Sequence, residues 1–256
     1  MGRFASTASL YEHLRPPYPS AFFRSVAHKL GVTKQSSLID LGTGPGLLAL
    51  GFGPYVGRVV GVDPEPAMLD AARLAASGTG RHLTLIEGKA ETLPLDIGSF
   101  DVVTIGRALH WMDRETTLAR LEHLVAYGGA IAICASFSAT DGRNPWLEGY
   151  NEIRRRWSPA KLWEEAGRGS RVHRDLSAFF RGSSFQPSEL VTFETNHLVG
   201  LHELAERALT YSSSSPEALG ENVEAMLRDV GKHLVPFHHD GAIAETIVST
   251  AQIVKR

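Results

Sequence analysis

A glycine-rich turn between a short apolar run and a helical pattern constrains the fold more than any other feature of the sequence. The turn lies in the segment Leu38-Ile39-Asp40-Leu41-Gly42-Thr43-Gly44-Pro45-Gly46, and a helix is predicted to begin near Leu47. Glycines lack a Cβ and let a ligand approach the backbone, while the start of a helix offers free N–H groups. Such a turn also opens dinucleotide-binding domains, so the turn alone does not choose a cofactor.

Short apolar runs alternate with helical patterns from residue 36 to about residue 136. This alternation predicts a parallel sheet covered by helices. The predicted strands are residues 37–41, 58–62, 83–87, 101–105 and 130–135. The predicted helices between them are residues 64–76 and 114–126. Gly128-Gly129 should end the second helix and turn the chain into the next strand.

The strand rhythm is lost after residue 138, which predicts a helical insertion over residues 138–187. The pattern then predicts a strand at 190–198, helices at 201–209 and 216–234, and a last apolar run at 242–254. We expect one domain over residues 1–256. Its parts would be an N-terminal cover at 1–35, a cofactor-binding core at 36–136, a helical cap at 138–187, and C-terminal strands and helices at 188–256.

Two carboxylates narrow the choice of cofactor. Asp63 ends the second predicted strand, about 20 residues past the first glycine, where a carboxylate can accept both ribose hydroxyls of an adenosine ligand. That position suits NAD and S-adenosylmethionine equally. Asp40 stands just before the turn, where it would repel a pyrophosphate but can face a cationic amino-acid end. Together with the Gly-x-Gly-x-Gly spacing, Asp40 favours S-adenosylmethionine.

Four motifs in order resemble one known family. They are Asp40-Leu41-Gly42-Thr43-Gly44-Pro45-Gly46, Val62-Asp63-Pro64-Glu65-Pro66-Ala67-Met68-Leu69, Gly88-Lys89-Ala90-Glu91-Thr92-Leu93-Pro94 and Ser99-Phe100-Asp101-Val102-Val103. The chain is similar, over about residues 8–136, to class I S-adenosylmethionine-dependent methyltransferases of the ubiquinone/menaquinone-biosynthesis and trans-aconitate type. The resemblance implies an α/β, Rossmann-like, doubly wound seven-stranded sheet. The sheet would be mostly parallel with one antiparallel strand, with helices on both faces and a helical insertion after the fifth strand.

The resemblance also implies which residues bind the cofactor. The three glycines of the turn would cradle the methionine part and Asp63 the ribose, while Met68 would lie on the adenine and Ala90 with Glu91 at its edge. The full predicted set is Tyr11, Arg15, Asp40, Gly42, Thr43, Gly44, Gly46, Asp63, Pro64, Met68, Ala90, Glu91 and Arg107. By themselves, a methionine on a helix is typical of a core, and Glu91 could be a solvated loop acid.

The N-terminal motif Tyr11-Glu12-His13-Leu14-Arg15-Pro16-Pro17-Tyr18-Pro19 looks like the lead-in of this subfamily, whose N-terminal segment covers the bound cofactor. Arg15 there could pair with the methionine carboxylate. A surface loop ahead of a helix at residues 20–30 is the alternative.

The fourth predicted strand is followed by His110 and Trp111, at the carboxyl end of the sheet where open α/β folds bind ligands. We predict His110 as a general base for the acceptor and, with Trp111, as part of its pocket. A base is optional in methyl transfer, so a structural histidine stays open. Nucleic-acid amino-methyltransferases carry Asp/Asn-Pro-Pro-Tyr/Phe at this position, and this chain does not.

The insertion contains Trp146 and the run Arg154-Arg155-Arg156. Its tryptophans could line an acceptor pocket and its arginines could bind a carboxylate, so we add Trp146 to the predicted acceptor residues. A dimer surface or plain helical packing is the alternative. We expect a monomer or a homodimer.

Charge and composition exclude several partner classes. Lys and Arg number 26 against 28 Asp and Glu, so no basic field collects nucleic acid. No apolar run approaches the roughly 20 residues that cross a bilayer, and one cysteine cannot form an internal disulfide. We expect no membrane partner and a cytoplasmic location. His238-His239-Asp240 lacks companion ligands, so we expect a solvated turn and no metal.

The sequence therefore predicts an enzyme that moves a methyl group from S-adenosylmethionine to oxygen, nitrogen or carbon of a small molecule. Two alternatives remain. One is an NAD-dependent oxidoreductase on a similar sheet, and the other is a protein that binds S-adenosylmethionine without catalysis.

Overall fold

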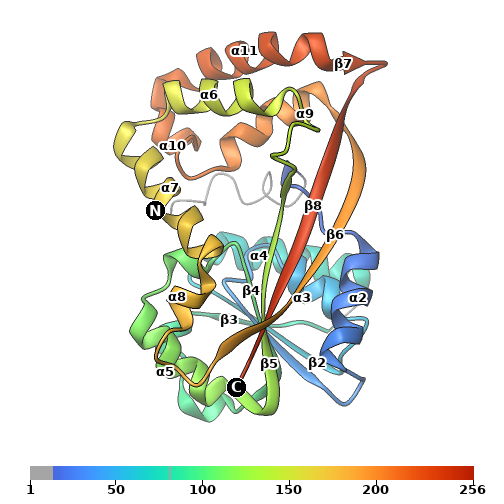
Figure 1. Cartoon of the computed structure of the whole chain (residues 1–256), viewed down its shortest axis with the longest axis vertical. Coiled ribbons are helices and arrows are strands. Elements are labelled where there is room, and N and C mark those ends of the chain that lie inside the picture. The colour runs from blue at the N-terminus through green and yellow to red at the C-terminus, as the bar shows by residue number, and fades with distance from the viewer. Residues whose placement is uncertain (1–13, 81) are drawn as a thin grey trace. The chain divides into compact units, whose positions relative to one another are not determined.

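The computed structural model describes residues 14–80 and 82–256 (Figure 1), so the predicted cofactor residue Tyr11 lies outside the described residues. The chain groups into two compact units. We call residues 18–135, 169–193 and 249–256 the sheet unit, and residues 14–17, 136–168 and 194–248 the helical unit. The one-domain organisation stays a prediction.

The sheet has the strand order β3-β2-β1-β4-β5-β8-β6, with β7 paired to β8 outside this path. The strands are β1 (Ser37–Leu41), β2 (Arg58–Asp63), β3 (Thr84–Glu87), β4 (Phe100–Gly106), β5 (Val125–Ser138), β6 (Gln186–Gly200), β7 (His238–His239) and β8 (Ala242–Lys255). Strands β1 to β5 pair in parallel, and β8 runs against its neighbours β5 and β6 (Figure 1). The seven-strand path with one reversed strand confirms the predicted fold class, to which β7 adds a two-residue strand.

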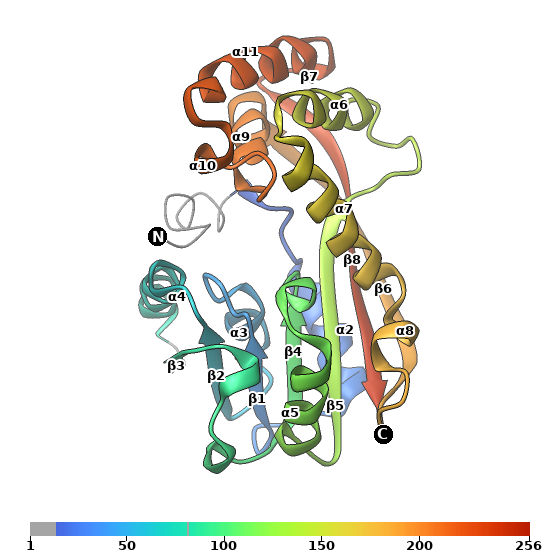
Figure 2. The ribbon, with the colours of Figure 1, turned by 90° about the vertical axis from the view of Figure 1, so that its left-hand side faces the viewer.

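Alternate residues of β1, β2, β4 and β5 enter two different cores, so both faces of the sheet are covered. The helices of the sheet unit are α2 (Ser20–Leu30), α3 (Leu47–Phe52), α4 (Pro66–Thr79), α5 (Arg114–Leu124) and α8 (Leu176–Phe180). Ile39 and Val103 share a core with α5, whereas Leu38 and Val102 share a core with α2 and α3. Figure 2 shows α5 and α2 on opposite faces. Strands buried on both faces explain the continuous apolar runs of the sequence.

The glycine pair after α5 does not have the predicted role. The helix already ends at Leu124, and β5 begins at Val125. Between the pairs Phe100↔Val125 and Val102↔Ala130 the register shifts, and Gly128 takes a φ of 75° within this bulge. The pair therefore shapes a bulge inside β5 instead of separating helix from strand.

The predicted helical insertion after β5 is confirmed: it contains α6 (Leu147–Trp157), α7 (Ala160–Arg174) and α8. Helices α6 and α7 contribute to the helical unit together with three helices from later in the chain, α9 (Leu201–Glu206), α10 (Pro216–Leu219) and α11 (Val223–Leu234). Helices α6, α9 and α11 enclose a separate apolar core that contains Trp146, Tyr150 and Met226. Of the helices described, none is both long and apolar enough to cross a membrane.

Candidate cofactor and acceptor site

The glycine-rich turn joins β1 to α3, and its three glycines all adopt left-handed conformations, with φ of 70° at Gly42, 53° at Gly44 and 87° at Gly46. A Cβ on Gly42 would lie 2.5 Å from the Cβ of Ala108, so the loop after β4 packs directly on the turn. A Cβ on Gly44 would meet, among the described residues, only the Met68 sulfur at 4.0 Å. Gly44 therefore presents open backbone that a ligand can approach.

The Asp63 carboxylate at the end of β2 holds this turn in place. Its Oδ2 accepts a hydrogen bond from the Gly44 amide at 2.8 Å, and its Oδ1 accepts one from the Glu65 amide at 2.9 Å. Burial raises the pKa of Asp63. Each carboxylate oxygen has further lone-pair capacity, so both can also accept a hydroxyl. A ribose diol beside Gly44 would match this acceptor pair.

Asp40 lies beneath the turn and not on its open side. The residue is 1% exposed, and its two oxygens accept hydrogen bonds from the hydroxyls of Thr43, at 2.7 Å, and Thr104, at 2.6 Å. Burial raises its pKa to about 6. These contacts tie β1, the turn and β4 together. Asp40 was predicted to face the cationic end of a ligand. In this position its carboxylate cannot contact a ligand and can affect one only through its charge at a distance.

The other predicted adenosine residues gather at the carboxyl ends of β2 and β3. The Gly88 amide donates to the Asp63 carbonyl at 3.0 Å, which joins the ends of the two strands. Ala90 starts a short 3-10 turn and is buried, as is Met68. Pro64, next to Asp63, is exposed. Ala90, Met68 and Asp63 therefore belong to one corner of the sheet unit.

Glu91 has a partner that the sequence did not predict. Its Oε1 accepts a hydrogen bond from the Asp113 amide at 2.9 Å, and Asp113 in turn caps α5 by accepting from the Thr116 amide. The pKa of Asp113 is lowered by the Thr116 hydroxyl and amide that donate to it. Glu91 thus fixes the loop that follows β4, which contains the predicted acceptor residues.

That loop positions Arg107, His110 and Trp111. Arg107 has a φ of 56°, and its guanidinium carbon lies 5.1 Å from the centroid of the Tyr18 ring. His110 and Trp111 share a 3-10 turn, with ring centroids 4.7 Å apart. Trp111 is 46% exposed and His110 is partly buried. Through Ala108, the same loop packs on Gly42, so His110 and Trp111 lie in a segment anchored to the glycine turn.

Two predicted site residues belong to the helical unit. Arg15 donates from Nη2 to the Thr210 carbonyl at 2.9 Å. Trp146 is 1% exposed in the core of that unit, and its indole N–H donates to the Ala244 carbonyl at 3.2 Å. These contacts give Trp146 a packing role. Both assignments to ligand binding stay predictions.

Sequence reasoning missed three residues of the site. Thr104 could have been found from strand register, since it pairs with Asp40 across β1 and β4. Tyr18 belongs to the N-terminal motif, but nothing in the sequence predicted that its ring would contact the Arg107 guanidinium. No sequence pattern distinguishes Ala108, and only its packing on Gly42 in the structure shows its role.

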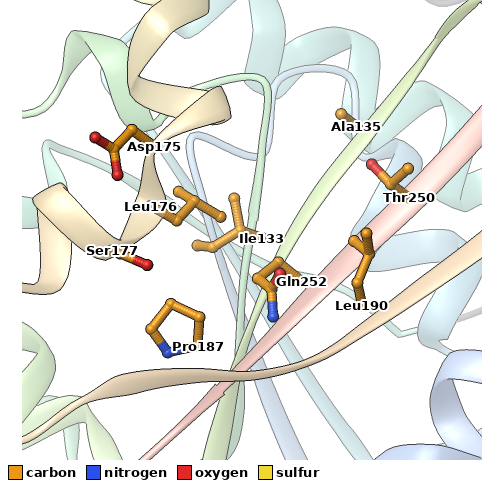
Figure 3. Close-up of a pocket in the computed structure, with 9 residues that line it drawn as sticks. All are labelled: Ile133, Ala135, Asp175, Leu176, Ser177, Pro187, Leu190, Thr250 and Gln252. Carbon is orange, nitrogen blue, oxygen red and sulfur yellow. The ribbon is translucent and has the colours of Figure 1, made fainter.

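A cavity of about 250 Å³ lies elsewhere in the sheet unit, beside α8, β5 and β8 (Figure 3). Its lining residues are Ile133, Ala135, Asp175, Leu176, Ser177, Pro187, Leu190, Thr250 and Gln252. None of them is a predicted site residue. Its one carboxylate, Asp175, caps α8 by accepting from the Ala178 amide.

The histidine pair near the C-terminus lies in a short strand, next to the predicted turn. His238–His239 form β7, which pairs with β8 across Asp240 and Gly241, both in left-handed conformations. The described part of the chain holds no group of three or more His, Cys, Asp or Glu that could bind a metal ion.

Comparisons with known proteins agree with this geometry. Residues 39–133 match a family model described as a methyltransferase domain. An uncharacterized methyltransferase of Mycobacterium tuberculosis is 32% identical over 150 residues, which are 59% of this chain and 58% of that protein. A demethylmenaquinone methyltransferase of Thermus thermophilus is 36% identical over 99 residues, 38% of this chain and 45% of that protein. The match to these relatives thus spans about half of their length.

Solved structures share the fold over nearly the whole chain. A protein of Anaeromyxobacter dehalogenans, proposed to be a type II methyltransferase, superposes with a TM-score of 0.65 at 22% identity and covers 94% of this chain and 97% of its own. A methyltransferase of Thiobacillus denitrificans bound to S-adenosylhomocysteine gives 0.57 at 16% identity, with 100% and 98% covered. At these identities the likeness shows the fold alone.

The doubly wound sheet and its glycine turn with Asp63 define an α/β protein with a candidate site for a nucleoside-type cofactor at the carboxyl ends of its strands. Over residues 39–133 the chain is similar to methyltransferase domains, and one solved protein of the same fold is bound to S-adenosylhomocysteine.

Proposed function

We propose that the protein transfers the methyl group of S-adenosylmethionine to an oxygen, nitrogen or carbon atom of a small molecule and releases S-adenosylhomocysteine. The observation that carries the proposal is the pair formed by open backbone at Gly44 and the buried Asp63 carboxylate that is bonded to it. A Cβ at Gly44 would fill the space where the ligand must approach. The residues present therefore fit an adenosine ligand with a short polar chain.

The proposed roles follow from these positions. Asp63 accepts hydrogen bonds from the ribose, Gly44 exposes its backbone to the ligand, and Met68 packs beside it. Asp40 and Asp63 bond to residues of the turn and so hold its conformation. When bound, the cofactor would supply a methyl group on a positively charged sulfur; the acceptor atom would bond to the methyl carbon as the carbon–sulfur bond breaks and S-adenosylhomocysteine leaves. Alignment of the acceptor with the methyl group and exclusion of water are then the main contributions to rate acceleration.

His110 is the residue proposed to take the acceptor's proton. It is partly buried, and Trp111 lies against it, so the ring has both an apolar neighbour and access to solvent. A neutral imidazole accepts a proton near neutral pH. A role as pocket wall would use the same position, and the two roles differ in their effects on turnover and KM.

Ligand binding tests the proposal directly. Calorimetry should detect S-adenosylmethionine and S-adenosylhomocysteine but not NAD. Tight binding of NAD without any response to S-adenosylhomocysteine would replace the proposal by the oxidoreductase alternative. A screen of phenols, amines and carboxylic acids for release of S-adenosylhomocysteine then identifies the acceptor. Binding of the cofactor with no release for any acceptor class would point to a protein that binds without catalysis.

A further inference from the structure

A polar cluster is buried in the helical unit around the ring of Tyr211. It contains two arginines, Arg207 and Arg154, that are each 5% exposed or less. Burial of a charge is costly unless the charge is paired and its hydrogen bonds are satisfied. The two arginines differ in this respect.

Arg207 is fully engaged by its neighbours. Its Nη1 and Nη2 donate to the two oxygens of Glu245 at 2.6 and 3.0 Å, and its Nε donates to the Leu14 carbonyl. Ser138 also donates to Glu245 at 2.6 Å. The charge of Arg207 is therefore balanced within the protein by Glu245.

Arg154, in the last turn of α6, has no such counter-ion. Its Nη1 donates to the Asn151 side chain at 3.0 Å and its Nε to the Ser214 hydroxyl at 3.3 Å. Within residues 14–80 and 82–256, no carboxylate forms an ion pair with Arg154, and its Nη2 donates to no side chain or carbonyl. Arg154 is 5% exposed, so among the described residues this charge is buried without a counter-ion and with an N–H group that no protein acceptor satisfies.

Aromatic rings hold the guanidinium in place. Its carbon lies 3.5 Å from the ring centroid of Tyr211, 5.6 Å from that of Trp163 and 5.9 Å from that of Tyr150. The guanidinium of Arg15 lies 3.9 Å from the same Tyr211 ring. Ring faces stabilise a cation but leave the N–H groups at its edge unused. The cluster thus orients a buried positive group whose Nη2 edge has no acceptor among the described residues.

We propose that Arg154, with Arg15 beside it on the Tyr211 ring, binds the carboxylate of a small molecule at its Nη2 edge. A planar guanidinium matches a carboxylate in geometry and charge, and the buried position strengthens the hydrogen bonds. The carboxylate has two sources, an acidic acceptor or the amino-acid end of the cofactor. Both sources rest on the proposed function, and the first would make the acceptor a carboxylic acid.

Succinate serves as the probe, and the unfolding temperature of the whole chain is the readout, with sodium chloride of equal ionic strength as reference. A ligand that binds only the folded state raises the unfolding temperature. Succinate should stabilise the parent protein, and Arg154→Met should weaken its binding at least about tenfold. Arg155→Met is the matched control, because Arg155 lies on the same helix but pairs with Glu152 at the surface. That control should bind succinate like the parent.

Stability without the probe gives a second readout. Methionine keeps the length of the arginine stem, and the Ser214 hydroxyl retains its bond to the Ala208 carbonyl. Arg154→Met should therefore unfold at the same or a higher temperature than the parent in the absence of acids. Arg154→Lys keeps the charge but not the planar fork, so it should bind succinate several-fold less well. This variant tests the site should the methionine variant not fold.

Calorimetry with S-adenosylhomocysteine and with methylthioadenosine, which lacks the amino-acid end, separates the two sources. Weaker binding of the first ligand alone in Arg154→Met assigns the carboxylate to the cofactor. Unchanged binding of both, with succinate lost, assigns it to an acidic acceptor. Equal affinity of Arg154→Met and Arg155→Met for succinate and S-adenosylhomocysteine overturns the proposal. A parent protein that binds no S-adenosylhomocysteine refutes the proposed function instead, and the succinate test still stands.

Discussion

Two glycines of the turn should respond to alanine in opposite ways. A Cβ at Gly42 would lie 2.5 Å from the Ala108 Cβ, which cannot rotate away, so the loop after β4 would have to move. The left-handed backbone adds strain of about 1–2 kcal/mol, and overpacking adds about 1–3 kcal/mol. We therefore expect Gly42→Ala to lower the free energy of unfolding by about 2–5 kcal/mol.

Gly44→Ala should show the reverse profile. Its backbone strain is similar, but its Cβ would meet only the Met68 sulfur, at 4.0 Å, among the residues described. The expected loss of stability is about 1–2 kcal/mol. Binding of S-adenosylhomocysteine should fall by at least about tenfold, or 1.4 kcal/mol, because the new methyl group occupies the approach to the backbone.

Denaturant unfolding and calorimetry measure the two effects, and Gly31→Ala provides the reference for strain alone. Gly31 ends α2 with a φ of 66° and has no atom within 4 Å of a built Cβ. If Gly42→Ala costs no more than Gly31→Ala, the packing of Ala108 on the turn is wrong. If Gly44→Ala binds S-adenosylhomocysteine as well as the parent, the ligand does not approach at Gly44.

Three further predictions concern single side chains. Asp63→Ala should weaken S-adenosylhomocysteine binding by about 1.5–3 kcal/mol in calorimetry, the scale of hydrogen bonds to a charged group; an unchanged affinity would exclude Asp63 from the ribose site. His110→Ala should lower turnover on the identified acceptor by about 10²–10⁴ with cofactor affinity nearly unchanged, whereas an effect mainly on KM that His110→Gln repairs would make the histidine a pocket wall. Asp40 has a folded-state pKa of about 6 against an ordinary 3.8, so its ionisation opposes folding. The contribution of Asp40 should lower the free energy of unfolding by about 2 kcal/mol as pH rises from 4 to 7, and Asp40→Asn should lack this fall. Equal pH dependence in parent and variant would contradict the burial of that charge.

The sheet was predictable because its strands are buried on both faces and show as apolar runs in the sequence. The predicted bounds of β1 agree with the structure, and β2 to β4 differ by one residue at one or both ends. The start of β5 was not predictable. Val125 and Ala126 continue the apolar pattern of α5, and only the pairing with Phe100 makes them strand. The local pattern of apolar residues does not reveal pairing with a strand that is distant in sequence.

The sequence predicted the open backbone of the glycine turn, but it did not predict the hydrogen-bond partners of the carboxylates near it. The glycine turn was expected to leave backbone open to a ligand, and Gly44 does so; the positive φ of Gly42, Gly44 and Gly46 is a further finding of the structure. Asp40 and Glu91 were assigned to ligand contact, but the side chain of each bonds to the protein itself. A carboxylate in a motif does not reveal whether it faces inward or outward, because both positions keep the same spacing.

The bulge in β5 offers a place to attach a reporter group. Tyr127 is fully exposed, and no atom lies within 4 Å of a Cβ built on Gly128 beside it. This end of the strand is opposite to the carboxyl ends that form the candidate site. The only native thiol of the chain, Cys134, is buried, and burial raises its pKa far above neutral pH, which keeps it protonated and unreactive. A single Tyr127→Cys substitution would therefore accept a fluorophore or spin label selectively, without removal of the native cysteine.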